Sequence, residues 1–263
     1  EYNGDHEPII NVIKEQAGDL YIGGDFMTID DEYYPSLAQF SENKFKNIGN
    51  VRGTFFKSYW SYPIVESICE YKDGYAIAGS FYYADSLFNP NVVFWDGEKF
   101  TDAIKDLSQE IHKMIAYDGK LYAIGYRNWK DYSNAPVIQW DGTTWRPFYR
   151  TLIENLIDNM KVIDDKLILW NDSEDPFTWD GTQLGIYDLP PDTISIFDNK
   201  ELVDIVKWNE NTVVVMEDWP SPKISYIKKD GDTEWHLLSD KEFDNYYGPV
   251  LSVTDERLFL AKK

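Results

Sequence analysis

The stretch Leu20-Tyr21-Ile22-Gly23-Gly24 is the first copy of a strand-like run that recurs along the whole chain. The later copies begin at Tyr75, Leu121, Leu167, Val213 and Leu258. Their starts are separated by 55, 46, 46, 46 and 45 residues. A spacing held over six copies indicates a structural repeat, and its length limits the architectures that could produce it.

Each repeat contains four short apolar runs separated by turn residues, as at Asp118-Gly119 and Asp141-Gly142. Asp-Gly between apolar runs predicts a tight hairpin in which both turn residues have positive φ. Helical repeats would need apolar residues at a spacing of about 3.6, and this pattern is absent. The sequence therefore predicts an all-β fold, a β-propeller of four-stranded antiparallel blades.

We expect one propeller domain over residues 1–263, and the repeats give its blades. Complete blades are expected at about 9–50, 64–107, 110–152, 156–192 and 202–240, followed by a partial blade at 249–263. Six blades with an incomplete last blade are the favoured arrangement. A five-bladed ring with an appended hairpin is the alternative.

The charge and the cysteine content narrow the classes of function. A formal net charge of −21 repels phosphate backbones and anionic lipids, which argues against nucleic-acid and membrane-surface roles. The sequence has no apolar run of 18 residues, so we expect no membrane insertion. The single cysteine, Cys69, allows no internal disulfide and is expected to be a buried, inert thiol.

Two motifs carry a family resemblance. The run from Leu20 to Phe26 and the run from Trp140 to Trp145 resemble kelch and galactose-oxidase-like β-propeller repeat proteins. They are most similar to the extracellular bacterial type with Tyr-x-Gly-Gly-x-Phe and Trp-Asp-Gly-x-x-Trp repeats. The resemblance implies an extracellular, cell-surface or periplasmic location. The copper chemistry of galactose oxidase is not implied, because its ligand motifs have no match here.

Long connections between strands are rich in aromatic and acidic residues. In a propeller, the connections between second and third strands and between blades emerge on one face, and loops on a rigid scaffold commonly bind ligands. Tyr and Trp join an apolar ring to a polar group, which suits sugars and protein partners. The candidate ligand-binding residues on this long-loop face are Trp60, Tyr82, Tyr83, Trp129, Tyr132, Trp219 and Tyr246.

A second candidate site comes from the first strand of each repeat. A polar residue stands nine positions before the second strand in five repeats, at Asn11, Glu66, His112, Asp158 and Asp204. These side chains are expected to form a ring at the mouth of a central channel. The ring could simply line a water-filled channel, orient a ligand, or bind a cation. Glu66, Asp158 and Asp204 are the candidate catalytic residues for hydrolysis.

The leading functional hypothesis is a non-enzymatic, extracytoplasmic module that binds a glycan or a protein partner through the long-loop face. The alternatives are a glycoside hydrolase or lyase that uses the acidic ring, and a structural propeller within a larger surface assembly. We expect no cofactor, and calcium is the one ion that the acidic groups would suit.

Overall fold

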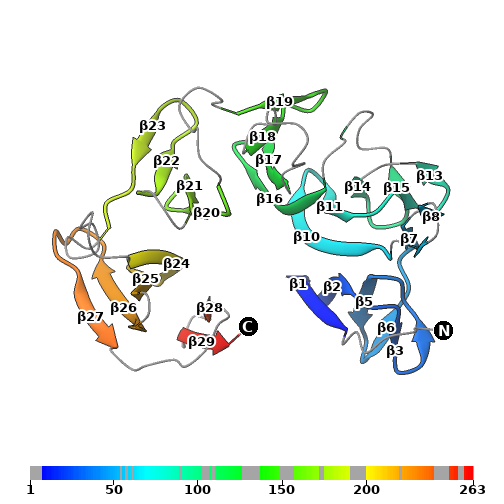
Figure 1. Ribbon diagram of the computed structural model, residues 1–263, viewed down its shortest axis with the longest axis horizontal. Helices are drawn as coiled ribbons and strands as arrows, with labels where there is room; N and C mark the ends of the chain where they lie inside the picture. The colour runs from blue at the N-terminus through cyan, green and yellow to red at the C-terminus, as the bar shows by residue number, and fades with distance from the viewer. Residues whose placement is uncertain are drawn as a thin grey trace. The chain divides into compact units, whose positions relative to one another are not determined.

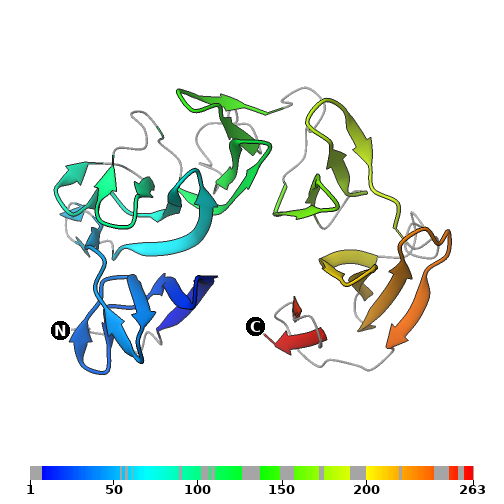
Figure 2. The same cartoon turned by 180° about the vertical axis from the view of Figure 1, so that it is seen from behind.

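The computed structural model describes residues 8–53, 55–56, 59–60, 62–88, 91–101, 107, 110–125, 137–148, 157–171, 175–189, 200–218, 221–239, 249–253 and 258–262. The chain divides into two compact units, Glu1–Asn155 and Leu156–Lys263. This division falls between the third and fourth predicted blades. Figures 1 and 2 show the elements of each unit from the two sides.

Unit 1 contains three four-stranded antiparallel sheets, here called blades one to three. Blade one consists of β1 (Ile9–Gln16), β2 (Asp19–Asp25), β5 (Leu37–Ser41) and β6 (Lys44–Lys46). Blade two consists of β10 (Ile64–Tyr71), β11 (Gly74–Ser80), β14 (Val92–Trp95) and β15 (Phe100–Thr101). Blade three consists of β16 (Ile111–Tyr117), β17 (Lys120–Gly125), β18 (Val137–Trp140) and β19 (Trp145–Pro147).

Unit 2 contains two more such sheets, blades four and five, and a separate hairpin. Blade four consists of β20 (Asn159–Ile163), β21 (Lys166–Trp170), β22 (Phe177–Trp179) and β23 (Leu184–Ile186). Blade five consists of β24 (Lys200–Trp208), β25 (Asn211–Asp218), β26 (Ser221–Lys229) and β27 (His236–Ser239). The hairpin pairs β28 (Pro249–Val253) with β29 (Leu258–Lys262), where the partial blade was expected.

The apolar faces of neighbouring blades pack against each other within each unit. In unit 1, Ala76 and Ala78 of blade two share one buried cluster with Ile111 and Met114 of blade three. In unit 2, Trp170 of blade four belongs to a buried cluster with residues of blade five. In blades three and four the second strand carries more buried residues than any other strand of its sheet.

The aspartates of the Trp-Asp-Gly motifs shape three hairpins in the same way. Oδ1 of Asp96, Asp141 and Asp180 accepts hydrogen bonds from the backbone N–H groups two and three residues later, at 2.7–3.0 Å. Only the glycine that follows each aspartate has positive φ, at 99°, 101° and 95°. The expectation of two positive φ values is therefore wrong for these turns. It holds in the Asp118-Gly119 turn of blade three, with φ values of 48° and 70°.

The second glycine of the Leu20 motif faces a β-bulge. The pairing of β1 with β2 shifts between Ile10 and Val12, so Asn11 is an extra residue opposite Gly24. A Cβ atom on Gly24 would lie 2.1 Å from the carbonyl oxygen of Ile9. In blade two, a Cβ atom on Gly79 would likewise lie 2.0 Å from the carbonyl oxygen of Ile64. The glycine is required there because the bulge brings two backbones close together.

We expect Gly24→Ala to destabilise unit 1 by about 1–3 kcal/mol, because its Cβ would overlap backbone atoms that cannot rotate away. Gly185→Ala in β23 is the matched control, since its Cβ would meet only the Thr178 hydroxyl, at 3.0 Å. Urea unfolding followed by tryptophan fluorescence measures both. Equal losses in the two variants would contradict the role of the bulge.

The turn aspartates give a prediction for acid stability. Hydrogen bonds to the carboxylates hold the pKa values of Asp96, Asp141 and Asp180 below their usual value of 3.8. A lowered folded-state pKa stabilises the fold above the unfolded value, and this stabilisation is lost as pH falls below it. The triple variant D96N/D141N/D180N should therefore show a shallower fall in melting temperature below about pH 4 than the wild type. Parallel curves would show that these turns do not contribute to acid unfolding.

Candidate functional site

Long connections of unit 1 form a small sheet of their own outside the blades. Strand β7 (Val51–Arg52) lies in the connection between blades one and two, and β12 (Tyr83–Ala84) and β13 (Leu87–Phe88) lie between β11 and β14. The order of the sheet is β13-β12-β7. A hairpin of blade two therefore pairs with the connection that leads into that blade.

Strand alternation gives this small sheet one buried face. Val51 and Ala84 are fully buried, and Leu87 packs against the same apolar cluster. The next residue along each strand points to the opposite face, as the period of two in a strand requires. The outward row consists of Arg52, Tyr83 and Phe88, which face each other across the three strands.

The three outward side chains form a continuous contact row. The Arg52 guanidinium carbon lies 5.2 Å from the centre of the Tyr83 ring, within the range of a cation–π interaction. The Tyr83 and Phe88 rings meet edge to face with their centres 5.4 Å apart. The centres of the Tyr82 and Phe88 rings are 6.5 Å apart. Phe88 is 61% exposed, so the row presents an aromatic surface with a cation at one end.

Backbone and carboxylate contacts fix the two connections to each other. The Asn50 N–H donates to Oδ1 of Asp85 at 2.9 Å, and the Asp85 N–H donates to the Asn50 carbonyl at 2.8 Å. The Tyr82 N–H donates to the Arg52 carbonyl at 2.9 Å. The Arg52 side chain also donates to the Asp85 carbonyl. The aromatic row therefore stands on ordered backbone, with an exposed carboxylate beside it.

The predicted long-loop residues divide into three groups. Tyr82 and Tyr83 lie together at this sheet, on the expected side of the blades. Trp60 lies in β9 (Tyr59–Trp60), which pairs with β8 (Phe55–Phe56), and only its backbone is described. Four more lie outside the described residues, namely Trp129, Tyr132, Trp219 and Tyr246.

Arg52 and Phe88 were not predicted as site residues. Arg52 follows the core-facing Val51, and Phe88 follows the core-facing Leu87. This alternation is the only local sign that the two side chains point outward. The pairing of β7 with β12 joins segments more than 30 residues apart, and no sequence period reveals it.

The predicted ring residues belong to both units: Asn11, Glu66 and His112 to unit 1, and Asp158 and Asp204 to unit 2. Asn11, Glu66 and His112 are the extra residues of bulges in β1, β10 and β16, so three blades of unit 1 place a polar residue at one structural position. The Asn11 amide donates to the Val65 carbonyl of the next blade, at 3.3 Å. Glu66, His112 and Asp158 also interact with other residues of the protein.

Asp204 does not occupy the equivalent position in blade five. The Trp208–Asn211 pair closes that hairpin, and the register shift lies between Leu202 and Asp204, so Val203 is the extra residue. The sequence alignment was wrong by one residue because it started the second strand at the first valine of an apolar run. In the observed pairing, Thr212 is the residue that corresponds to Leu20 and Leu121 of the earlier blades.

Asp204 joins two neighbouring blades. Its Oδ1 accepts a hydrogen bond from Nζ of Lys161 in blade four at 2.9 Å and one from the Ile205 N–H at 2.8 Å. The Asp204 side chain is only 12% exposed. Ser67 has the corresponding place in blade two, where its hydroxyl bridges to the backbone N–H and carbonyl of Met114 in blade three. Both contacts are structural links between inner strands.

Metal and thiol chemistry have little support in the described part of the chain. Within those residues, no group of three or more His, Cys, Asp or Glu side chains is arranged to hold a metal ion. Cys69 is buried as expected, and burial raises the pKa of its thiol to about 12. A thiol that stays protonated at neutral pH is a poor nucleophile.

Comparison with known proteins decides the fold. The chain is similar in structure to "YCF48 bound to D1 peptide", with a TM-score of 0.54 and 12% identity over 92% of this chain and 72% of that one. It is also similar to the β-propeller domain of the Trilobed protease from Pyrococcus furiosus, with a TM-score of 0.54 and 13% identity over 88% of this chain and 67% of that one. The chain has the β-propeller fold.

A third similar structure is the extracellular domain of a protein assigned to the hybrid two-component systems of B. thetaiotaomicron. The TM-score is 0.56 and the identity 12%, over 89% of this chain and only 30% of that chain. No family model and no curated protein matches the sequence. The described residues include no helix long and apolar enough to cross a membrane.

The Asp204 contacts predict a structural role for this residue. Asp204→Ala should destabilise unit 2 by about 1–3 kcal/mol, because Lys161 and the Ile205 N–H lose a partly buried acceptor. Replacing the pair together, as D204A/K161M, should recover part of this loss, because no unpaired ammonium remains. Thermal unfolding of the two variants tests the link. A stable D204A protein would restore Asp204 as a candidate for ligand binding or catalysis.

Proposed function

We propose that this β-propeller is a non-enzymatic binding module that recognises a glycan or protein partner through its long-loop face. The observation that supports this most directly is the outward row of Arg52, Tyr83 and Phe88. These residue types dominate binding energy at protein interfaces, and aromatic rings stack on sugars. The row lies on a paired sheet, so little conformational entropy is lost when a partner binds.

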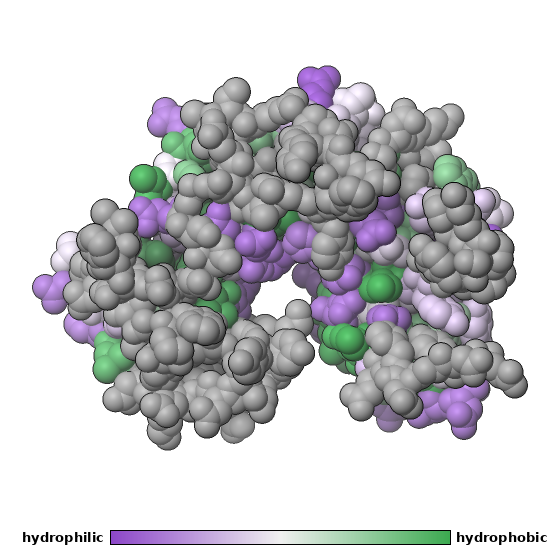
Figure 3. All heavy atoms as spheres, viewed as in Figure 1, coloured by the Kyte–Doolittle hydropathy of each residue, from purple (hydrophilic) through white to green (hydrophobic). Residues whose placement is uncertain are grey.

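The charge of the molecule supports a polar or basic partner. The formal net charge is −21, and Asp85 lies exposed beside the aromatic row. On the face seen in Figure 3, the coloured residues include hydrophilic groups with hydrophobic areas between them. Aromatic contact area with a polar surround is typical of a specific interface.

The alternative of a glycoside hydrolase or lyase has less support. Its three candidate acids do not share one structural position, because Asp204 is displaced by one residue and bonded to Lys161. Among the similar structures, one is the propeller domain of a protease, which shows that such a domain can belong to an enzyme. Similarity of fold alone brings no catalytic residue to this chain.

An extracytoplasmic location and a place in a larger protein or surface assembly are parts of the same proposal. The similar structure from B. thetaiotaomicron is an extracellular domain, and this chain covers only 30% of its length. The kelch-type repeat motifs point in the same direction, and membership of that family is likewise proposed here. Nucleic acid is not among the proposed partners, because the acidic protein repels its phosphate backbone.

A binding screen tests the proposal. The wild type and the variant Y83A/F88A would be applied to a broad glycan array with calcium and with chelator. We expect glycan hits that weaken about tenfold or more in the variant, as for loss of hot-spot aromatics. Loss of signal in chelator would add calcium to the site. A blank array would direct the search to protein partners by cross-linking on intact cells.

The control variant is I186A/L237A, which truncates two exposed apolar residues of unit 2, at 68% and 58% exposure. It should bind like the wild type. If Y83A/F88A also bound like the wild type to every partner found, the long-loop face of unit 1 would not be the binding surface.

A further inference from the structure

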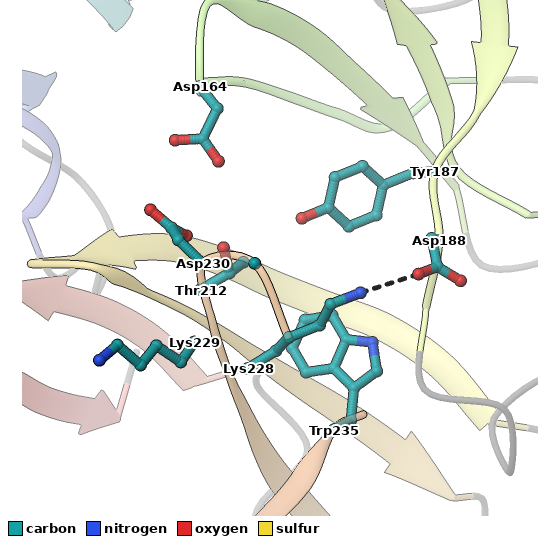
Figure 4. Close-up of a pocket in the computed structure, with 9 residues that line it drawn as sticks. Asp164, Tyr187, Asp188, Thr212, Lys228, Lys229, Asp230 and Trp235 are labelled. Carbon is teal, nitrogen blue, oxygen red and sulfur yellow. Dashed lines mark hydrogen bonds and ion pairs between the residues drawn. The ribbon is translucent and has the colours of Figure 1, made fainter. Parts of the chain in front are cut away.

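Unit 2 contains a pocket of about 200 Å³ that is lined by two hairpin turns and by the start of the connection between its two blades (Figure 4). Its walls come from both blades of the unit. Asp164 belongs to the turn after β20, Tyr187 and Asp188 follow β23, and Asp230 belongs to the turn after β26. The pocket is therefore separate from the long connections that carry the aromatic row of unit 1.

A partly buried lysine, Lys207, links two walls of this pocket. Nζ of Lys207 in β24 lies 2.9 Å from Oδ2 of Asp164 and also pairs with Oδ1 of Asp230. Lys207 is 25% exposed, while the two carboxylates are 57% and 51% exposed. The second oxygen of each carboxylate is not used by Lys207, so each can accept a hydrogen bond from a ligand.

An ion pair and an aromatic ring form the opposite wall. Nζ of Lys228 donates to Oδ2 of Asp188 at 2.8 Å and lies 5.4 Å from the centre of the Trp235 ring. The indole N–H of Trp235 is buried and has no hydrogen-bond partner in the structure. Other tryptophans in the described part of the chain share this feature, so it does not distinguish the pocket. The wall offers a ligand the indole ring and the Lys228–Asp188 pair.

Tyr187 completes the lining with a ring and a hydroxyl group. Figure 4 shows this side chain pointing into the space between Asp164 and Asp230. Burial, together with the nearby carboxylates, raises the pKa of Tyr187 to about 12. The hydroxyl is therefore protonated at neutral pH. It hydrogen-bonds the Thr212 side chain and can make one further hydrogen bond to a ligand.

The balance of charge selects the class of ligand. Each of the three lining aspartates has an ammonium partner, since Asp164 and Asp230 share Lys207 and Asp188 pairs with Lys228. Lys229 pairs with Glu210 instead. With no carboxylate left unpaired, the site has no strong preference for an ion. It instead offers many acceptors and donors beside aromatic rings. A small neutral molecule with several hydroxyl groups uses all of them, and the volume is below the usual range for drug-sized ligands.

We propose that this pocket binds a single neutral sugar residue. The Asp164 and Asp230 carboxylates accept hydrogen bonds from adjacent hydroxyl groups, and the Tyr187 hydroxyl donates or accepts a third. The Trp235 and Tyr187 rings provide apolar contact area for the sugar ring. This site does not depend on the proposed function of the long-loop face.

Isothermal titration calorimetry of the full chain with glucose, galactose, mannose, xylose and N-acetylglucosamine tests the proposal. We expect at least one of them to bind, and Y187F and D164N each to weaken that binding by about tenfold or more. Y187F keeps the packing of the ring but removes the hydrogen bond to Thr212, so its melting temperature is measured beside the titration to show that the variant is folded.

The matched control for D164N is D118N, which changes the aspartate at the same turn position of blade three. Both aspartates have a φ of 48°, a conformation that asparagine also adopts. D118N and Y83A/F88A should bind the sugar like the wild type.

Three results would overturn the proposal. The first is that none of the five sugars titrates at concentrations up to tens of millimolar. The second is that a sugar binds equally to the wild type, Y187F and D164N. The third is that calcium chloride or ethylamine binds in a way that D164N abolishes while no sugar binds, which would make the pocket a cation site.

Discussion

The packing of one sheet's apolar face against the next is the interaction on which the rest of this structure depends. A four-stranded sheet alone leaves its apolar residues in water, and each blade of a unit covers those of its neighbour. Inner strands must come close for this to happen. Gly23 shows how close, since a Cβ atom there would lie 2.4 Å from the Val65 side chain of the adjacent blade. Polar links such as Ser67–Met114 and Lys161–Asp204 then fix the neighbours in register.

With the core supplied by stacked sheets, the ends of the blades are free to serve other purposes. On one side of unit 1, two connections have become a three-stranded sheet whose outer face carries a cation and two aromatic rings. In unit 2, charged residues from two blades and from the connection between them surround a small pocket. The two features differ in chemistry, since one is an open aromatic surface and the other a concave, polar site.

Local patterns in the sequence predicted the parts of the fold that depend on local interactions. The four-stranded repeat and most hairpin positions follow from apolar alternation and turn residues, and the partial sixth repeat corresponds to β28 and β29. The register of blade five was missed because apolar character begins at Val213, whereas the hairpin sets the pairing from Asn211. Tyr82 and Tyr83 were predicted because aromatic residues in a loop are visible in the sequence. Arg52, Lys207 and Tyr187 join their sites through contacts between distant segments, and no motif marks them.

The pairing of β7 with β12 has a consequence for how this surface can change over generations. Two loops that share a ladder of backbone hydrogen bonds cannot gain or lose residues independently, because a shift in either would exchange its buried and exposed faces. The proposed recognition surface is therefore free to diversify by replacing side chains at 52, 83 and 88 while the loop lengths stay constant. Relatives that bind different partners should share the backbone here and differ in those three residues.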